Sequence, residues 1–239
     1  MRFLKSTGAS RKLDALRNNG WLAEQPAEFK ELLLSRSRLM QFEKNETIYS
    51  AGDPPGGPYG LVRGAIRIEL WVSDSGSHVA HLAAPGFWVG EMAALRHKPR
   101  AVTVTAAKEC VLAHLPLAQF EALALDPGFV RRFAALSAEN TALALQVIRD
   151  LLTPEIGGRV ASKLQTLARF QRQSGCNEVA ARSISVTQSD LAMMCSISRK
   201  CLNHHLARLQ QDGVIVTGYG VIQILDRERL SRLAEGQGR

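Results

Sequence analysis

Glu91 and Arg100 are the two residues whose types and spacing most directly suggest chemistry. They lie on either side of a short Ala-rich turn in the stretch GEMAALRHKPRAVTVTA, residues 90–106. A carboxylate accepts hydrogen bonds, whereas a guanidinium donates them from a rigid planar fork that matches carboxylates and phosphates. The two side chains therefore either pair with each other in a salt bridge or each hold one part of a ligand.

A second group of polar side chains lies in VTQSDLAMMCSISRKCLNHHLARLQQDGVI, residues 186–215. Thr187 and Asp190 have the spacing of a capping box, and Ser198 can cap a second helix that ends near Gln211. Two helices joined by a tight turn form a helix-turn-helix, in which the start of the second helix meets base edges in the major groove. The alternative is an ordinary three-helix packing unit. The predicted DNA-binding residues are Thr187, Gln188, Ser198, Arg199, Lys200, Asn203 and His204.

The residues that follow support this interpretation. Gly213 ends the second helix, and VIVTGYGVIQIL, residues 214–225, contains two short strands around Gly218-Tyr219-Gly220, which would form the wing of a winged helix. Of the formal net charge of +8, +6 lies from residue 156 onward. A basic C-terminal third is the electrostatic footprint expected for nucleic acid, although basic surfaces also arise without any partner.

Elements of another kind must position Glu91 and Arg100. Residues 26–37 have the apolar spacing of a helix, with Pro26 near its start. From Leu39 to Leu115, short alternating runs such as AIRIELWV and AVTVTA are separated by Gly, Pro, Asp and Ser. This texture predicts an antiparallel sandwich or roll.

After Pro127 the apolar period becomes helical for about seven turns. The steps of three and four are typical of a coiled-coil seam, although a helix packed on its own domain shows the same pattern. Apolar residues also lie off the seam, so we expect one side to pack on the β domain and the other on a second copy of the chain. Thr153-Pro154 breaks the helix and marks a hinge. The seam residues are Phe129, Phe133, Leu136, Asn140, Leu143 and Val147, and the off-seam residues are Ala135, Ala142, Ala144, Leu145 and Ile148.

The order of these parts resembles the Crp–Fnr family of bacterial transcription regulators from about residue 26 to residue 235. The stretches FEKNETIYSAGD, YGLVRGAIRIEL, LAAPGFWVGEMAAL, GRVASKLQTLA and TQSDLAMMCSISR carry this resemblance. It implies an α+β fold, a homodimer, double-stranded DNA and RNA polymerase as partners, and no enzymatic activity. The implied parts are an N-terminal extension (1–25), a jelly-roll-like cyclic-nucleotide-binding β-roll (26–126), a dimerisation helix (127–153) and a winged helix-turn-helix DNA-binding domain (154–239).

Within this resemblance, residues 90–106 are similar to the phosphate-binding cassette of the family and of protein kinase A. The similarity implies that Arg100 holds a cyclic phosphate, together with backbone N–H groups of the turn at Met92 and Ala93. Glu91 would accept a hydrogen bond from the ribose 2′-hydroxyl. Gly90 would keep the approach free of a side chain, and the small Ala101 would let its backbone N–H reach the phosphate.

The same resemblance favours cAMP as the effector and leaves cGMP, or both nucleotides, open. Ala101 is similar to cAMP-type cassettes, whereas many cGMP-selective sites carry Thr or Ser there. Ala144 and Leu145 align with hydroxyl-bearing residues that contact the base in the enterobacterial cAMP receptor. The polar candidates for the base are Asn140 and Thr141, one turn earlier, although Asn140 could instead set the register of a coiled coil.

The family comparison also predicts an altered operator. Arg199 can read guanine, but Lys200 stands where the enterobacterial receptor has Glu and cannot accept a hydrogen bond from cytosine. We therefore expect a palindromic operator whose half-sites keep a guanine and differ elsewhere. Arg182 and Arg208 are candidates for phosphate contacts.

Other functions are disfavoured. No long apolar run or signal peptide is evident, which indicates a cytoplasmic protein whose four cysteines are reduced. An iron–sulfur sensor would need cysteines in residues 1–50, where none occurs.

The alternatives kept open are a ligand-independent regulator and a sensor of another signal such as a haem-bound gas. The adjacent pair His204-His205 lacks metalloprotease spacing, so neither a metal site nor an enzyme is expected. The candidate haem ligands are His78, His81, His97 and His114.

Overall fold

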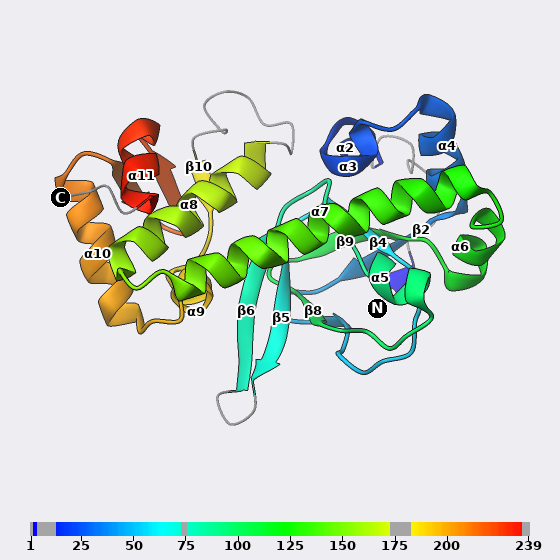
Figure 1. Ribbon diagram of the computed structural model, residues 1–239, viewed down its shortest axis with the longest axis horizontal. Helices are drawn as coiled ribbons and strands as arrows, with labels where there is room; N and C mark the ends of the chain where they lie inside the picture. The colour runs from blue at the N-terminus through cyan, green and yellow to red at the C-terminus, as the bar shows by residue number, and fades with distance from the viewer. Residues whose placement is uncertain (1, 4–12, 73–75, 173–182, 236–239) are drawn as a thin grey trace. The chain divides into compact units, whose positions relative to one another are not determined.

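The computed structural model of the chain describes residues 2–3, 13–72, 76–172 and 183–235 (Figure 1). The chain divides into two compact units. The first unit comprises residues 1–77 and 83–143, and the second comprises residues 78–82 and 144–239. The first contains the predicted β-roll, and the second contains the predicted winged helix-turn-helix.

The β-rich part contains two antiparallel sheets, as the alternating runs predict. One sheet has the strand order β1-β2-β9-β4-β7 and the other the order β3-β8-β5-β6. The strands of the first sheet are β1 (Arg2–Phe3), β2 (Arg38–Phe42), β9 (Cys110–His114), β4 (Tyr59–Arg63) and β7 (Trp88–Val89). Those of the second are β3 (Thr47–Tyr49), β8 (Thr103–Ala106), β5 (Ile66–Val72) and β6 (Gly76–Ala83).

Strand β9 shows how the core is organised. Its residues alternate between two hydrophobic clusters, because successive side chains of a strand point to opposite faces. Leu112 joins the cluster that also contains Leu61, Ile66 and Val104 from both sheets. Val111 joins a second cluster, in which helices cover the other face. This explains why CVLAH is apolar without strict polar alternation.

Three N-terminal helices complete the second cluster: α2 (Asp14–Asn18), α3 (Gly20–Ala23) and α4 (Ala27–Arg36). Helix α4 confirms the helix predicted from residues 26–37, whereas α2 and α3 lie in the segment predicted as an extension. Trp21 is buried and packs against Trp88 and Phe133 at ring-centroid distances of 6.0 and 5.0 Å. Part of the predicted extension is therefore a component of the core.

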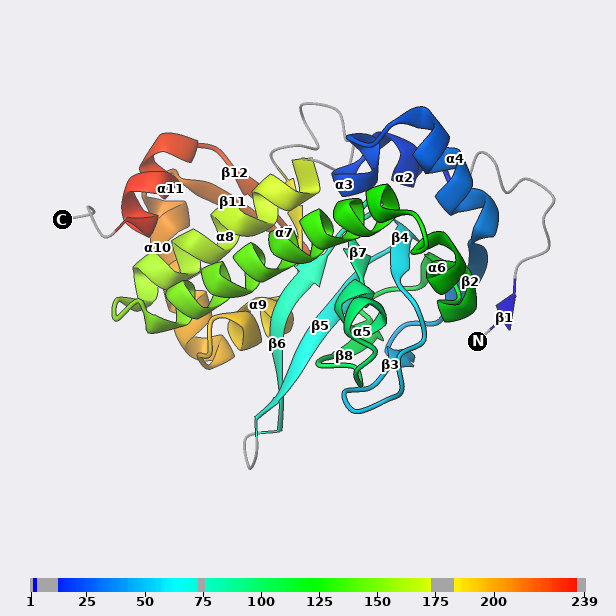
Figure 2. The ribbon, with the colours of Figure 1, turned by 45° about the vertical axis from the view of Figure 1, so that its right-hand side comes forward.

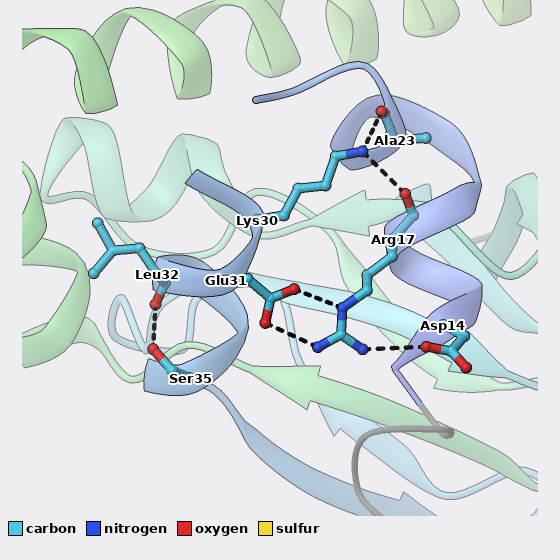
Figure 3. A network of polar contacts seen from close by, with 7 residues as sticks. All are labelled: Asp14, Arg17, Ala23, Lys30, Glu31, Leu32 and Ser35. Carbon is cyan, nitrogen blue, oxygen red and sulfur yellow. Dashed lines mark hydrogen bonds and ion pairs between the residues drawn. The ribbon is translucent and has the colours of Figure 1, made fainter. Parts of the chain in front are cut away.

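Polar contacts connect α2 to α4 (Figure 3). Arg17 donates from Nε and Nη2 to the two carboxylate oxygens of Glu31, at 2.8 and 3.0 Å, and from Nη1 to Asp14 at 3.2 Å. Lys30 donates to the carbonyl oxygens of Arg17 and Ala23. These bonds align the two helices so that their apolar faces meet the same core.

Helix α7 (Pro127–Leu152) confirms the long helix, and it ends at the predicted break before Pro154. Its predicted seam packs within the chain: Phe129, Phe133 and Leu136 belong to the second cluster. The off-seam residues Leu145 and Ile148 are 62% and 52% exposed. The seam pattern therefore marks the face that packs on this chain, and the off-seam face is the exposed one. Short helices α5 (Glu91–Arg96) and α6 (Leu117–Leu123) precede α7.

The second unit contains the winged helix-turn-helix that the sequence predicts, together with residues 78–82 of β6 and 144–152 of α7, and Figure 2 shows these elements from a second angle. A small sheet of order β10-β12-β11 packs with the helices, and α11 contacts α8. None of the helices in the described ranges is long and apolar enough to span a membrane. The elements are α8 (Ile156–Arg172), β10 (Ser183–Ser185), α9 (Gln188–Met194), α10 (Arg199–Gln211), β11 (Ile215–Gly218), β12 (Val221–Ile224) and α11 (Arg227–Ala234).

Candidate functional site: a buried arginine and an exposed recognition helix

Arg100 is the centre of the first candidate site. Its side chain is buried, with 4% of the residue exposed. Nη1 donates to the carbonyl oxygen of Gly90 at 2.9 Å, and Nη2 donates to that of Gly57 at 2.7 Å. The guanidinium carbon lies 4.3 Å from the ring centroid of Tyr49, a cation–π distance. The cation is thus held in a fixed orientation by neutral groups.

The two glycines beside Arg100 are required by geometry. Gly90 has φ +90°, and a Cβ there would lie 2.3 Å from Arg100 Nη1. Gly57 has φ +86°, and its Cβ would lie 2.0 Å from the Leu115 carbonyl oxygen. Any other residue would combine an unfavourable backbone conformation with a clash. The role of Gly90 predicted from the sequence, to leave space, is consistent with this geometry.

Glu91 does not pair with Arg100. Its carboxylate is buried, and Oε1 accepts a hydrogen bond of 3.0 Å from Asn140 Nδ2, which also donates to the carbonyl oxygen of Trp88. Burial raises the pKa of Glu91 above its ordinary range, against the opposing effects of the Asn140 bond and the Arg100 charge. No ion pair in the described ranges joins Arg100 to a carboxylate. The salt-bridge interpretation is therefore wrong.

Two buried charges that do not pair are costly unless something else compensates them. The bonds to Gly90 and Gly57 engage two of the five guanidinium N–H groups, so Arg100 retains donors for an anion. Glu91 retains acceptor capacity beyond its bond from Asn140. Arg100 can thus donate to an anion and Glu91 can accept from a hydroxyl group.

The other residues predicted for the ligand site differ in how far they are exposed. Ala93 is buried in α5 and Met92 is half-buried, whereas Ala101 and Thr141 are exposed. Thr141 donates to the carbonyl oxygen of Ser137, within its own helix. Asn140 contacts Glu91, a role that the sequence did not suggest.

Sequence reasoning missed Tyr49 and Gly57, the two partners of Arg100 from other parts of the chain. Tyr49 lies in β3, and Gly57 precedes β4. Nothing in the local pattern distinguishes Tyr49 from any aromatic strand residue. Gly57 could have been noticed only as one of two consecutive glycines after Pro54-Pro55.

The second candidate site is the helix-turn-helix. Thr187 caps α9, since its hydroxyl accepts a bond from the backbone N–H of Asp190 at 3.0 Å. Ser198 caps α10 by accepting from the backbone N–H of Cys201 at 3.2 Å. Both caps agree with the sequence prediction, and α10 ends at Gln211 as predicted. The two helices are therefore positioned by local signals.

One face of α10 is buried and the opposite face is polar. Its buried residues Leu202, Leu206 and Leu209 pack against the rest of the second unit. All residues predicted to contact DNA are exposed, and they lie at or near the starts of α9 and α10. These residues are Thr187, Gln188, Ser198, Arg199, Lys200, Asn203 and His204. Arg208 is also exposed, whereas Arg182 lies outside the described residues.

Two family models match the chain at these sites. The model described as a cyclic nucleotide-binding domain matches residues 39–126, which include Glu91 and Arg100. The model described as a Crp-like helix-turn-helix domain matches residues 158–233, which include α9 and α10. The chain belongs to the Crp–Fnr family. It is a DNA-binding transcription regulator and not an enzyme.

Two transcription regulators and one solved structure are similar to this chain over most of its length. The transcriptional regulator SdrP of Thermus thermophilus is 28% identical over 206 residues, which cover 84% of this chain and 96% of SdrP. A CRP-like cAMP-activated global transcriptional regulator of Mycobacterium tuberculosis is 24% identical and covers 84% of this chain and 90% of its own. The structure of FixK2 from Bradyrhizobium japonicum has a TM-score of 0.72 at 21% identity, with 82% of this chain and 96% of FixK2 covered.

The histidines considered as haem ligands differ in their surroundings. His81 is fully buried, and desolvation lowers its pKa to about 3. His97 lies 3.6 Å from Glu121, and His114 stacks on Tyr59. No group of three potential metal ligands occurs among the described residues. Cys110, Cys195 and Cys201 are free thiols, and Cys176 lies outside the described residues.

Proposed function

We propose that this regulator is a homodimer that binds a cyclic nucleotide, with cAMP favoured over cGMP, and recognises a palindromic operator. The observation that carries the nucleotide proposal is the buried guanidinium of Arg100, which has no carboxylate partner in the described ranges. A fixed planar donor fork matches carboxylates and phosphates, and the cyclic nucleotide-binding domain model that covers Arg100 favours a phosphate. The relative from Mycobacterium tuberculosis is named as cAMP-activated, which supports the same effector.

In this proposal the roles divide between Arg100 and Glu91. Arg100 binds the cyclic phosphate, and Glu91 accepts a hydrogen bond from the ribose 2′-hydroxyl. Ala101 favours cAMP because its side chain cannot meet the guanine amino group as a hydroxyl would. The hydrogen bond from Asn140 connects Glu91 to helix α7, so a ribose hydroxyl that donates to Glu91 would change the strength of that hydrogen bond. A change at the ligand can thereby reach α7.

The dimer proposal rests on the exposed side of α7. Exposed positions recur at alternating steps of three and four, which is the spacing of a coiled-coil seam. Leu145, Ile148 and Leu152 are 62%, 52% and 76% exposed, an apolar surface that a second copy would bury. The seam that we propose comprises Arg131, Ala134, Ala138, Thr141, Leu145, Ile148 and Leu152. It replaces the seam expected from the sequence.

The dimer would place two copies of α10 in successive major grooves of an operator. Ligand binding would favour one of two arrangements of the hinge at Thr153–Ile156 and so change operator affinity. RNA polymerase is the expected partner at a promoter. Because a transcription regulator must reach genomic DNA, we place the protein in the bacterial cytoplasm.

The test is calorimetric titration of the full chain with cAMP and with cGMP. We expect tighter binding of cAMP, and a loss of about 30- to 5,000-fold in Arg100→Leu. The matched control is Arg96→Leu, which removes an exposed arginine from the same segment. A melting curve shows whether Arg100→Leu still folds, since Arg100 also bonds two carbonyl oxygens.

Three outcomes would contradict the proposal. Absence of binding by either nucleotide would favour a ligand-independent regulator or another signal. Equal affinity of folded Arg100→Leu and the unchanged chain would show that Arg100 does not hold the phosphate. If sedimentation at micromolar concentration shows a monomer both with and without ligand, the dimer proposal is wrong.

A further inference from the structure

The tip of the wing carries a single large side chain. Strands β11 and β12 pair in antiparallel register up to Gly218 and Val221, and Tyr219-Gly220 forms the connection. Tyr219 is fully exposed, so its ring contacts almost nothing in the chain. Gly220 has φ +67°, a left-handed conformation that such a short connection favours. Because glycines flank it on both sides, the phenol projects alone.

The wing has an unusual composition for a DNA-facing hairpin. Residues 214–225 contain no Lys, Arg or His, although phosphate contacts usually come from cationic side chains. Val216 and Val221 are 45% and 39% exposed on the same hairpin. The wing therefore offers DNA a neutral ring with one hydroxyl group rather than a positive charge.

The wing is tied to the recognition helix. Gln210, near the end of α10, accepts two hydrogen bonds at Oε1, from the backbone N–H of Thr217 at 3.0 Å and from its hydroxyl at 2.7 Å. Strand β11 also contacts α10, as Figure 2 shows. The wing is therefore held to the C-terminal end of α10, so it follows α10 when that helix lies in a major groove.

We propose that Tyr219 enters the minor groove next to the recognition site and reads A·T against G·C pairs there. This inference rests on DNA binding by α10. The minor groove is only about 6 Å wide and is bordered by phosphates, so a lone neutral ring without neighbouring side chains fits it. In that groove a G·C pair presents the guanine N2 amino group, which obstructs deep entry, whereas an A·T pair presents acceptors only. The Tyr219 hydroxyl can donate to those acceptors.

The experiment uses a duplex recovered by binding-site selection with the full chain from a random library. Dissociation constants are measured over a range of salt for the unchanged chain, Tyr219→Ala, Tyr219→Phe and the control Val216→Ala. We expect Tyr219→Ala to weaken binding about 5- to 30-fold without changing the salt slope, because no ion is released by a neutral contact. Tyr219→Phe should retain part of the affinity, and Val216→Ala should change little.

Substituted duplexes identify the groove. Inosine·cytosine presents the major groove of G·C and the minor groove of A·T. Flanking A·T and I·C pairs should therefore bind alike and G·C pairs more weakly, and Tyr219→Ala should abolish this difference. If I·C instead behaves like G·C, the contact is not in the minor groove and the inference is overturned.

Two further results separate this inference from DNA binding itself. If Arg199→Ala weakens binding while Tyr219→Ala does not, the regulator binds DNA but the wing inference fails. If Tyr219→Ala lowers only transcription with RNA polymerase present, Tyr219 contacts protein instead and the inference also fails. Failure of the unchanged chain to select any duplex would contradict DNA binding as well. Because Tyr219 is exposed, all variants should fold, which a melting curve verifies.

Discussion

The ion pair between Lys163 and Asp150 provides a quantitative test of the second unit. Lys163 Nζ lies 3.1 Å from Asp150 Oδ2, and the two side chains are 0% and 2% exposed. Asp150 Oδ1 also accepts hydrogen bonds from Ser162 at 2.6 Å and Gln146 at 2.7 Å. The pair joins the end of α7 to the first half of α8, on either side of the proposed hinge.

Lys163→Met should lower the free energy of unfolding by about 3 kcal/mol. Removing one member of a buried ion pair costs about 3–5 kcal/mol, because the remaining charge is left buried without its counter-ion. We expect the lower value because Asp150 would keep its bonds from Ser162 and Gln146. Asp150→Leu should cost about 5 kcal/mol, since it isolates a buried ammonium and removes the acceptor of both bonds.

The double variant Asp150→Leu/Lys163→Met should be more stable than Asp150→Leu alone, because no uncompensated charge remains. Urea unfolding followed by circular dichroism at 222 nm measures all three, since all three tryptophans lie before residue 89 and report on the first unit. Arg229→Met, which breaks an exposed pair with Asp212, is the control and should cost about 1 kcal/mol or less. If the loss of unfolding free energy in the double variant equals the sum of the losses in the two single variants, the assignment of a buried, coupled ion pair is refuted.

Three further predictions concern the ligand, the DNA and acid stability. Acidification should weaken cAMP binding when Glu91 becomes protonated, and this should occur at a higher pH than the ordinary pKa of a glutamate because the pKa of Glu91 is raised. Calorimetric titrations at several pH values should show the decrease in affinity, and Glu91→Gln should make the affinity less dependent on pH. Arg199→Ala should cost about 1–3 kcal/mol of operator affinity and relax one base position, and Lys200→Glu should alter the half-site recovered by selection. His81 should contribute a decrease in unfolding free energy of about 1.4 kcal/mol per pH unit between its unfolded pKa of about 6.5 and its folded pKa of about 3, because only the unfolded state takes up the proton in that range. Acid unfolding should therefore show a smaller slope in His81→Phe.

Local signals explain what was predictable in this chain. The hydroxyls of Thr187 and Ser198 cap the helices that they were expected to cap, because a cap bond joins residues only three apart. Helix α7 ends before Pro154 for a similarly local reason. The two helices of the helix-turn-helix and the two wing strands could therefore be outlined from sequence, whereas α8, β10 and α11 were not predicted individually.

Contacts between distant residues explain what was not predictable. Gly57 lies 43 residues before Arg100, and no local rule connects the two. The stretch around Gly20 breaks into two helices of five and four residues, too short to show a clear period. The 3–4 pattern of α7 fits a partner helix or the chain's own core equally well, so only the structure distinguishes them.

The N-terminal helices determine how this sensory domain could be recombined with other proteins. A fragment that begins at residue 39, where the domain model begins, would lack Leu16, Trp21 and Leu22, which are at most 5% exposed. Their removal would uncover the indole of Trp88 and the ring of Phe133. Gly20 packs so closely on Gly86 that a Cβ would lie 2.3 Å from the Gly86 carbonyl oxygen, a fit that an unrelated leader would not reproduce. A chimeric sensor that grafts this domain onto a different output must therefore carry the chain from Leu13 onward as one module.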